Sequence, residues 1–183
     1  MTVLGKILIA AIVVFSVLFV LSGRMKIRLP ADSELLQELQ YEPVQQEGVP
    51  APFVVEKKGS EFTVIPKYNY EIRGMVVTLH KSKSISDNAH EMWKDFLNVE
   101  DICVLWGGNL KQSLYGKVHF TSGDWTCFFQ TKDFDVYRAF DLTKISNNHI
   151  LSNDPAIEKA VLAADIGDQI YMKGYLVDYT KSD

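Results

Sequence analysis

A histidine with three polar neighbours is the clearest candidate for chemistry in this chain. Ser146, Asn147 and Asn148 precede His149, shortly before a predicted helix. These side chains could orient the imidazole as an acid or base, or bind a substrate near a helix N-terminus that favours anions. Asn-Asn pairs also form Asx-type loops, so a structural role for His149 is the favoured alternative. We therefore expect a polar loop at 146–153, with Ser146, Asn147, Asn148 and His149 as the candidate binding residues and His149 as the candidate catalytic residue.

Carboxylates and further histidines would have to complete a catalytic or metal site. In a membrane-anchored hydrolase, Asp101 or Asp124 is the carboxylate we would pair with His149. His90 begins a partial H-E-x-x-H zinc motif, but a lysine stands at the position of the second histidine. The spacing of the other histidines requires no metal, so we predict neither a metal site nor a cofactor.

Motifs of the common nucleotide-binding and hydrolase classes are missing from the sequence. It has no G-x-S-x-G elbow, no Walker A loop and no dinucleotide fingerprint. Aromatic residues could line a ligand groove, although packing in a core is their commoner use. The aromatic residues in question are Trp106, Phe120, Trp125, Phe128, Phe129 and Phe140.

The charge of the chain is divided unevenly. The whole chain has 19 basic and 23 acidic residues, and residues 1–28 contain four of the basic ones and no acid. The rest therefore has 15 basic against 23 acidic side chains, a net charge of −8. Proteins that bind nucleic acid usually carry a clustered basic surface, so nucleic acid is not an expected partner.

The two cysteines, Cys103 and Cys127, lie in separate apolar runs that are typical of strands. Their spacing matches no C-x-x-C redox or zinc pattern. Two buried thiols are the simpler interpretation, and a disulfide is the alternative if the domain lies outside the cytoplasm. Spacing alone does not decide between them, because it does not show whether the two Cα atoms approach each other.

The N-terminus carries a membrane signal. Residues 7–22 are sixteen uncharged residues, and with the preceding residues they are just long enough for a bilayer core of about 30 Å. The segment is either a signal-peptide core or a retained span. Its best cleavage pattern, at residues 20–22, is poor, which favours a retained single-pass anchor over residues 1–28 that contacts the lipid bilayer.

Two features of the sequence predict opposite orientations of the domain. Arg24, Lys26 and Arg28 follow the apolar run, and by the positive-inside rule they place the domain in the cytoplasm. A short basic start followed at once by an apolar run is, however, how export signals are built. We favour an extracytoplasmic domain.

Residues 29–52 are polar and contain four of the six prolines. Proline-biased segments tend to stay extended. We expect this segment to be a linker between the anchor and a β-rich globular domain at residues 53–183.

Alternating apolar and β-branched residues predict strands along this domain. We expect a hairpin at 53–65, a long strand at 68–80, a strand at 102–106, a second hairpin at 118–129 and an edge strand at 136–140.

Two short helices and a final strand complete the prediction. The first helix follows Asn88, and the second has Asp154 as N-cap, Pro155 at its first position and Gly167 as its stop. We expect Ile157, Val161 and Ala164 to form the buried face of the second helix. Two long strands, at 68–80 and 168–179, each contain a central glycine. The predicted fold is mainly β with two short helices, arranged as a small, coiled, partly closed OB-like barrel.

Four sequence runs carry a resemblance to a known group of proteins. The runs are DICVLWG, GDWTCFFQ, SNNHILSND and GDQIYMKGYLVDY. They resemble those of a family of uncharacterised bacterial proteins with an N-terminal membrane segment. The resemblance implies an origin in the bacterial envelope, but it implies no activity and no catalytic residues.

Taken together, these features predict a non-enzymatic binding or assembly module, tethered to the membrane, that contacts another envelope protein through an exposed sheet edge or the loop at 146–153. A membrane-anchored hydrolase that uses His149 with a nearby carboxylate is the alternative. Binding of an oligosaccharide or lipid headgroup through the aromatic residues is a weaker third interpretation.

Overall fold

Antiparallel strands dominate the protein, as the sequence predicts. The computed structural model describes residues 29–80, 96–123 and 125–182. Six strands form the main sheet and two form a separate hairpin. The strands of the main sheet are β1 (Val44–Gln46), β2 (Phe53–Lys57), β3 (Ser60–His80), β4 (Asn98–Leu105), β7 (Ile145–Leu151) and β8 (Gln169–Ser182). The hairpin consists of β5 (His119–Gly123) and β6 (Thr126–Gln130).

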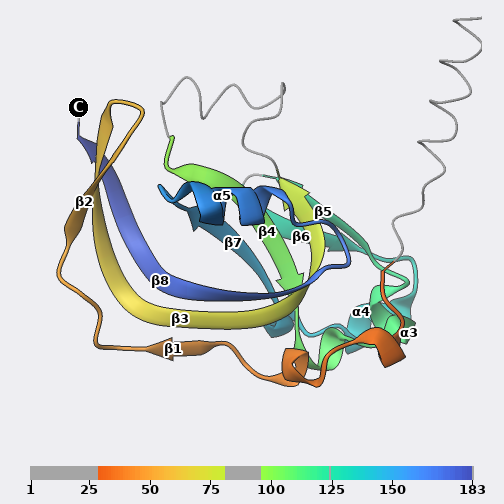
Figure 1. The fold of residues 1–183 in the computed structure, drawn as a ribbon. Helices are drawn as coiled ribbons and strands as arrows, with labels where there is room; N and C mark the ends of the chain where they lie inside the picture. Colours follow the sequence, from red (N-terminus) through yellow and green to blue (C-terminus); the bar gives the residue numbers. More distant parts are fainter. Residues whose placement is uncertain (1–28, 81–95, 124, 183) are drawn as a thin grey trace, which may run out of the picture.

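The 21-residue strand β3 organises the main sheet. Along one edge it pairs with β8 from Glu61 to Met75. Along the other edge it pairs in turn with β2, β1 and β4. Figure 1 shows β3 and β8 curving together across the molecule as a two-stranded ribbon. The predicted strands at 61–65 and 68–80 are thus parts of one strand, which passes through Pro66 at an irregularity in the register with β8.

The predicted OB-like barrel is not formed, because the sheet stays open. Its strand order is β1-β3-β4-β7, with β2 and β8 also paired to β3. Closure would require a further pairing between terminal strands such as β7 and β8. Within the described part of the chain, β7 pairs only with β4 and β8 only with β3.

Strand β4 lies at the centre of the fold, and all eight of its residues are buried. On one of its faces, Ile102 and Val104 belong to a hydrophobic cluster against which Val161 of helix α5 (Pro155–Leu162) packs. On the other face, Cys103 and Leu105 belong to a second cluster, against which residues of the β5–β6 hairpin pack. A strand covered on both sides carries apolar residues on both faces, which explains the continuous run ICVLW in the sequence.

A disulfide joins the hairpin to the main sheet. Cys103 on β4 and Cys127 on β6 are bonded, with their Cα atoms 6.1 Å apart. The sequence allows either two separate thiols or a disulfide, and the structure has the disulfide.

Helix α5 begins as the sequence predicts. Asp154 caps it by accepting hydrogen bonds from the backbone N–H groups of Ala156 and Ile157, and Pro155 occupies its first turn. Its end was predicted too late, since α5 stops at Leu162 and Gly167 lies in the following turn with a φ of 97°. Ile157 was wrongly placed on the buried face, because 52% of it is exposed.

The predicted edge strand at 136–140 is wrong. This region forms helix α4 (Phe134–Ala139), for which Asp133 is the N-cap. The Asp133 carboxylate accepts hydrogen bonds from two backbone N–H groups of the first turn. Those bonds satisfy N–H groups at the start of the helix that have no partner within the helix, which favours a helix at this position. The short helix α3 (Gln112–Tyr115) lies near α4 in Figure 1.

Residues 29–52, predicted as an extended linker, pack against the domain. Leu39 is 2% exposed within the cluster on the hairpin side of β4, and Leu29 and Leu35 pack against the same cluster. Strand β1 pairs with β3, and Glu42 accepts a hydrogen bond of 3.0 Å from the Trp106 indole N–H. Burial of the leucines offsets the entropy lost in fixing this segment.

Two predicted segments lie outside the described residues: the membrane anchor at 1–28 and the first helix, after Asn88. Among the described residues, no helix combines the length and hydropathy needed to cross a bilayer.

Candidate functional site

The SNNH run is a strand and not a loop. Ser146 to His149 lie within β7, where Ser146 and Asn148 are opposite Val104 and Ile102 of β4. Asn147 and His149 are opposite Cys103 and Asp101. Because successive side chains of a strand point to opposite faces, the four candidate residues are divided into two pairs. They do not form one site.

His149 meets a carboxylate on the hairpin face of the sheet. Its Nδ1 lies 2.5 Å from Oδ1 of Asp101. The Asp101 side chain is 8% exposed and that of His149 is 29% exposed. If Nδ1 carries the proton and donates a hydrogen bond to the carboxylate, the lone pair of the ring is on Nε2. A histidine that acts as a general base is oriented by a carboxylate in the same way. Of the two acids predicted as partners, Asp101 is therefore within hydrogen-bond reach, and Asp124 lies outside the described residues.

The surroundings of this pair also support a structural role. The Asn147 amide donates to the Trp125 carbonyl at 3.0 Å and lies 3.5 Å from Oδ2 of Asp101. Trp125 has a φ of 62°, in the left-handed region, and its ring lies edge-on to the His149 ring at 6.0 Å. Asn147 thus holds the end of the β5–β6 hairpin against β7, close to the disulfide that joins the same two layers.

Ser146 and Asn148 bind the backbone on the opposite face. The Asn148 amide donates to the carbonyl of Ile102 at 3.2 Å and to that of Ser146 at 3.3 Å. Tyr70 hydrogen-bonds the Ser146 side chain, and burial raises the pKa of this tyrosine. Since these bonds lie within the sheet, the two residues stabilise the pairing of β7 and present little to a ligand.

The other histidines are spread across the fold. His80 at the end of β3 is opposite Asp101 in the β3–β4 register, so Asp101 lies between two histidine-bearing strands. His119 lines a cavity beside the hairpin, and His90 lies outside the described residues. Within the described ranges, no three histidine, cysteine or acidic residues are grouped so that they could hold a metal ion.

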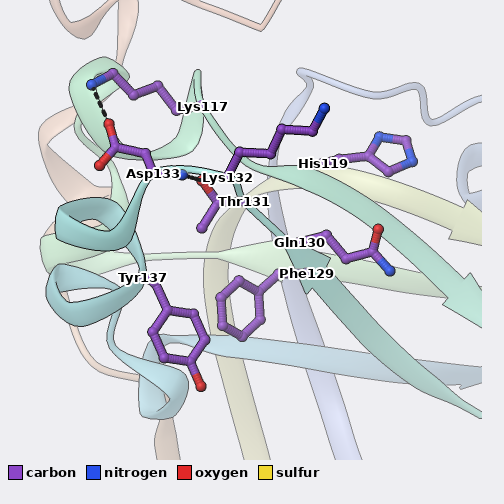
Figure 2. Close-up of a pocket in the computed structure, with 8 residues that line it drawn as sticks. All are labelled: Lys117, His119, Phe129, Gln130, Thr131, Lys132, Asp133 and Tyr137. Carbon is purple, nitrogen blue, oxygen red and sulfur yellow. Dashed lines mark hydrogen bonds and ion pairs between the residues drawn. The ribbon is translucent and has the colours of Figure 1, made fainter.

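A cavity of about 780 Å³ lies between the hairpin and α4. Figure 2 shows the Tyr137 and Phe129 rings side by side on its wall and Lys117 paired with Asp133 at one end. The two rings are stacked with their centroids 6.0 Å apart. Lys117 lies 2.8 Å from the Asp133 carboxylate and holds the pKa of that carboxyl below its ordinary value. The cavity thus combines an aromatic wall with cationic and polar groups.

The sequence predicts an exposed sheet edge without naming the strand, and the structure shows such an edge along β8. This 14-residue strand pairs with β3 alone among the described strands, and it is exposed over much of its length. Large side chains along it are exposed: Tyr171 at 51%, Tyr175 at 46% and Leu176 at 36%. The pattern of residues 169–182 predicts a strand but not whether its second edge is covered, since that depends on distant pairing.

Comparison with known proteins finds no protein similar to this chain. The chain matches no family model, no curated protein and no solved structure. The resemblance to membrane-anchored bacterial proteins therefore stays a prediction. The class that the structure defines is a mainly β domain with an open antiparallel sheet and a disulfide between its layers.

Proposed function

We propose that this protein is a non-enzymatic binding module, tethered to the bacterial inner membrane, that recognises another envelope protein at the outer edge of β8. The observation that carries the proposal is the length and exposure of that edge. An open strand edge presents unpaired N–H and C=O groups, and an extended segment of a partner can pair with them.

Side chains along β8 would give such a contact its specificity. Tyr171 and Tyr175 are each about half exposed, and the Tyr171 hydroxyl donates to Glu71 at 2.8 Å. Arg73 lies over the Tyr171 ring with 4.2 Å between the guanidinium carbon and the ring centroid. Exposed aromatic side chains beside a strand edge are of the residue types that act as anchors in protein interfaces.

A periplasmic position for the domain is part of the proposal. The disulfide between Cys103 and Cys127 is consistent with it, because such bonds persist in oxidising compartments. The tether rests on the uncharged residues 7–22 of the sequence.

Photo-crosslinking in living bacteria tests the strand-edge interface. A benzophenone side chain in place of Tyr171 is expected to give one discrete, stoichiometric adduct with an envelope protein. The additional change Tyr175→Asp should weaken that adduct by about tenfold or more, because an aromatic anchor typically contributes about 2 kcal/mol. Adducts are measured by immunoblot and identified by mass spectrometry.

The matched control places the same side chain at Tyr41, an aromatic residue that is 57% exposed and lies outside the sheet strands. It should give no such adduct. Recovery of only uncrosslinked protein from the Tyr171 position, or equal adducts at both positions, would count against the proposal.

A second candidate function, hydrolysis, is favoured by one observation only, the 2.5 Å contact between His149 and Asp101. If this pair is catalytic, His149→Ala should lower hydrolysis by about 100- to 10,000-fold, the usual contribution of a general base. The full chain in detergent is assayed against chromogenic ester, phosphate and glycoside substrates. His119→Ala, which removes an exposed histidine of the cavity, is the control. Equal rates for the parent protein and both variants would remove this candidate.

A further inference from the structure

We propose that one corner of the domain, formed by Lys132, Phe134, Tyr137 and Arg138 around helix α4, rests on the surface of the phospholipid bilayer. We call these four residues the α4 corner. The inference rests on the membrane tether of the proposed function but is independent of the β8 interface. It concerns which part of the domain faces the membrane.

The point where the chain enters the domain argues for this corner. Leu29 packs against the hydrophobic cluster that contains Tyr115, and the Tyr115 hydroxyl donates to the carbonyl of Pro30. Only seven peptide steps separate Ser22, the last residue of the apolar run, from Leu29. A fully extended chain spans at most about 25 Å over that number of residues. The part of the domain around Tyr115 must therefore lie close to the membrane surface.

Direct contacts connect this entry point to α4. Tyr115 ends helix α3, and two residues later Lys117 forms its ion pair with Asp133, the N-cap of α4. Phe129 belongs to the residues packed against the same cluster as Leu29, and its ring stacks on that of Tyr137. Figure 1 shows α3 and α4 at one end of the molecule and β2 at the opposite end.

The exposed side chains of the corner suit a bilayer interface. Phe134 is 69% exposed and Tyr137 is 59% exposed, although both are large. They are three residues apart and so share one face of α4. Aromatic rings with this exposure favour the headgroup region, where the apolar part is buried and a hydroxyl stays hydrated.

Cationic side chains accompany the rings. The Arg138 guanidinium lies over the Phe134 ring at 5.8 Å, and Lys132 lines the cavity beside Tyr137. Both are long enough to reach lipid phosphates. The acids Asp133 and Asp135 offset much of this charge. We therefore expect the rings to supply most of the attachment, so that zwitterionic phosphatidylcholine suffices without anionic lipid.

Quenching by brominated lipid tests the contact. The full chain carrying Phe134→Trp is reconstituted in phosphatidylcholine vesicles whose acyl chains carry bromine near their carbonyl ends. The emission added by this substitution is the difference between the variant and the parent protein. In brominated vesicles this added emission should have much lower intensity than in vesicles without bromine. Its maximum should also lie at a shorter wavelength than that of a tryptophan exposed to water. Val54→Trp on β2 is the matched control, since Val54 is 58% exposed at the far end, and its added emission should be unaffected.

The possible outcomes separate this inference from the tether. If the protein sediments with the vesicles but the added emission of Phe134→Trp is quenched no more than that of Val54→Trp, the tether holds and the inference is overturned, because the contact is not specific to this corner. If the protein does not stay with the vesicles, both the tether and the inference fail. None of these results bears on the proposed pairing of a partner protein with the outer edge of β8, which is tested separately by photo-crosslinking.

Discussion

Replacing Cys103 and Cys127 together by alanine is expected to lower the free energy of unfolding by about 3–4 kcal/mol. The disulfide closes a loop with a sequence separation of 24 residues. In the chain-entropy treatment, opening a loop of this size raises the conformational entropy of the unfolded chain and so lowers the free energy of the unfolded state by about that much. The disulfide joins the β5–β6 hairpin to a sheet with which, among the described strands, that hairpin shares no pairing, so the loss should loosen the hairpin in particular.

Urea unfolding of the two proteins, followed by tryptophan fluorescence, measures this difference. The unfolding midpoint should fall, and the parent protein under reducing conditions should behave like the double variant. Alanine is preferred to serine at position 103 because this side chain is fully buried, and a hydroxyl there would add its own desolvation cost. Equal midpoints for the parent and variant under oxidising conditions would show that the hairpin is held by packing alone.

The parts of the fold that follow from local chemistry are the ones the sequence predicts. Lys58 and Gly59 both have positive φ values in the turn of the first hairpin, and turn-forming residues there are visible in the sequence. Asp154 and Pro155 fix the start of α5 because a cap depends only on neighbouring residues. By contrast, Asp133 caps α4 in the same way, but the apolar residues after it resemble a strand as much as a helix.

Features that depend on distant partners could not be predicted. Pro66 suggests a break between two strands, and only the pairing with β8 shows that β3 continues through it. The polar run from Ser146 resembles a loop, but its backbone pairs with β4 as a strand, and the Asn148 amide finds a partner within the sheet. His149 could be chosen from sequence, whereas the selection of Asp101 over other acids required the register of β4 and β7.

Replacing Phe62 by alanine is expected to lower the free energy of unfolding by about 3–5 kcal/mol. Phe62 is 1% exposed in a hydrophobic cluster with Val64 and Leu97. The Tyr179 ring of β8 lies against it at 6.5 Å between centroids. Removing the ring takes away most of the apolar contact at this end of the β3–β8 ribbon, and a cavity remains where neighbouring strands cannot close in. Val54→Ala, on the exposed side of β2, should cost less than about 0.5 kcal/mol by comparison.

This variant also shows whether the long ribbon unfolds as one unit. Phe62 lies near the start of β3, and Trp106 is buried in a different cluster, at the end of β4. Because β3 runs through both clusters, loss of packing at Phe62 should lower the midpoint reported by tryptophan fluorescence as much as the midpoint reported by far-ultraviolet circular dichroism. If only circular dichroism shifts, the ribbon end formed by β2, β3 and β8 unfolds separately from the body of the sheet. Coincident shifts would instead mean that the edge of β8 is held rigidly by the whole core, as a preformed docking strand requires.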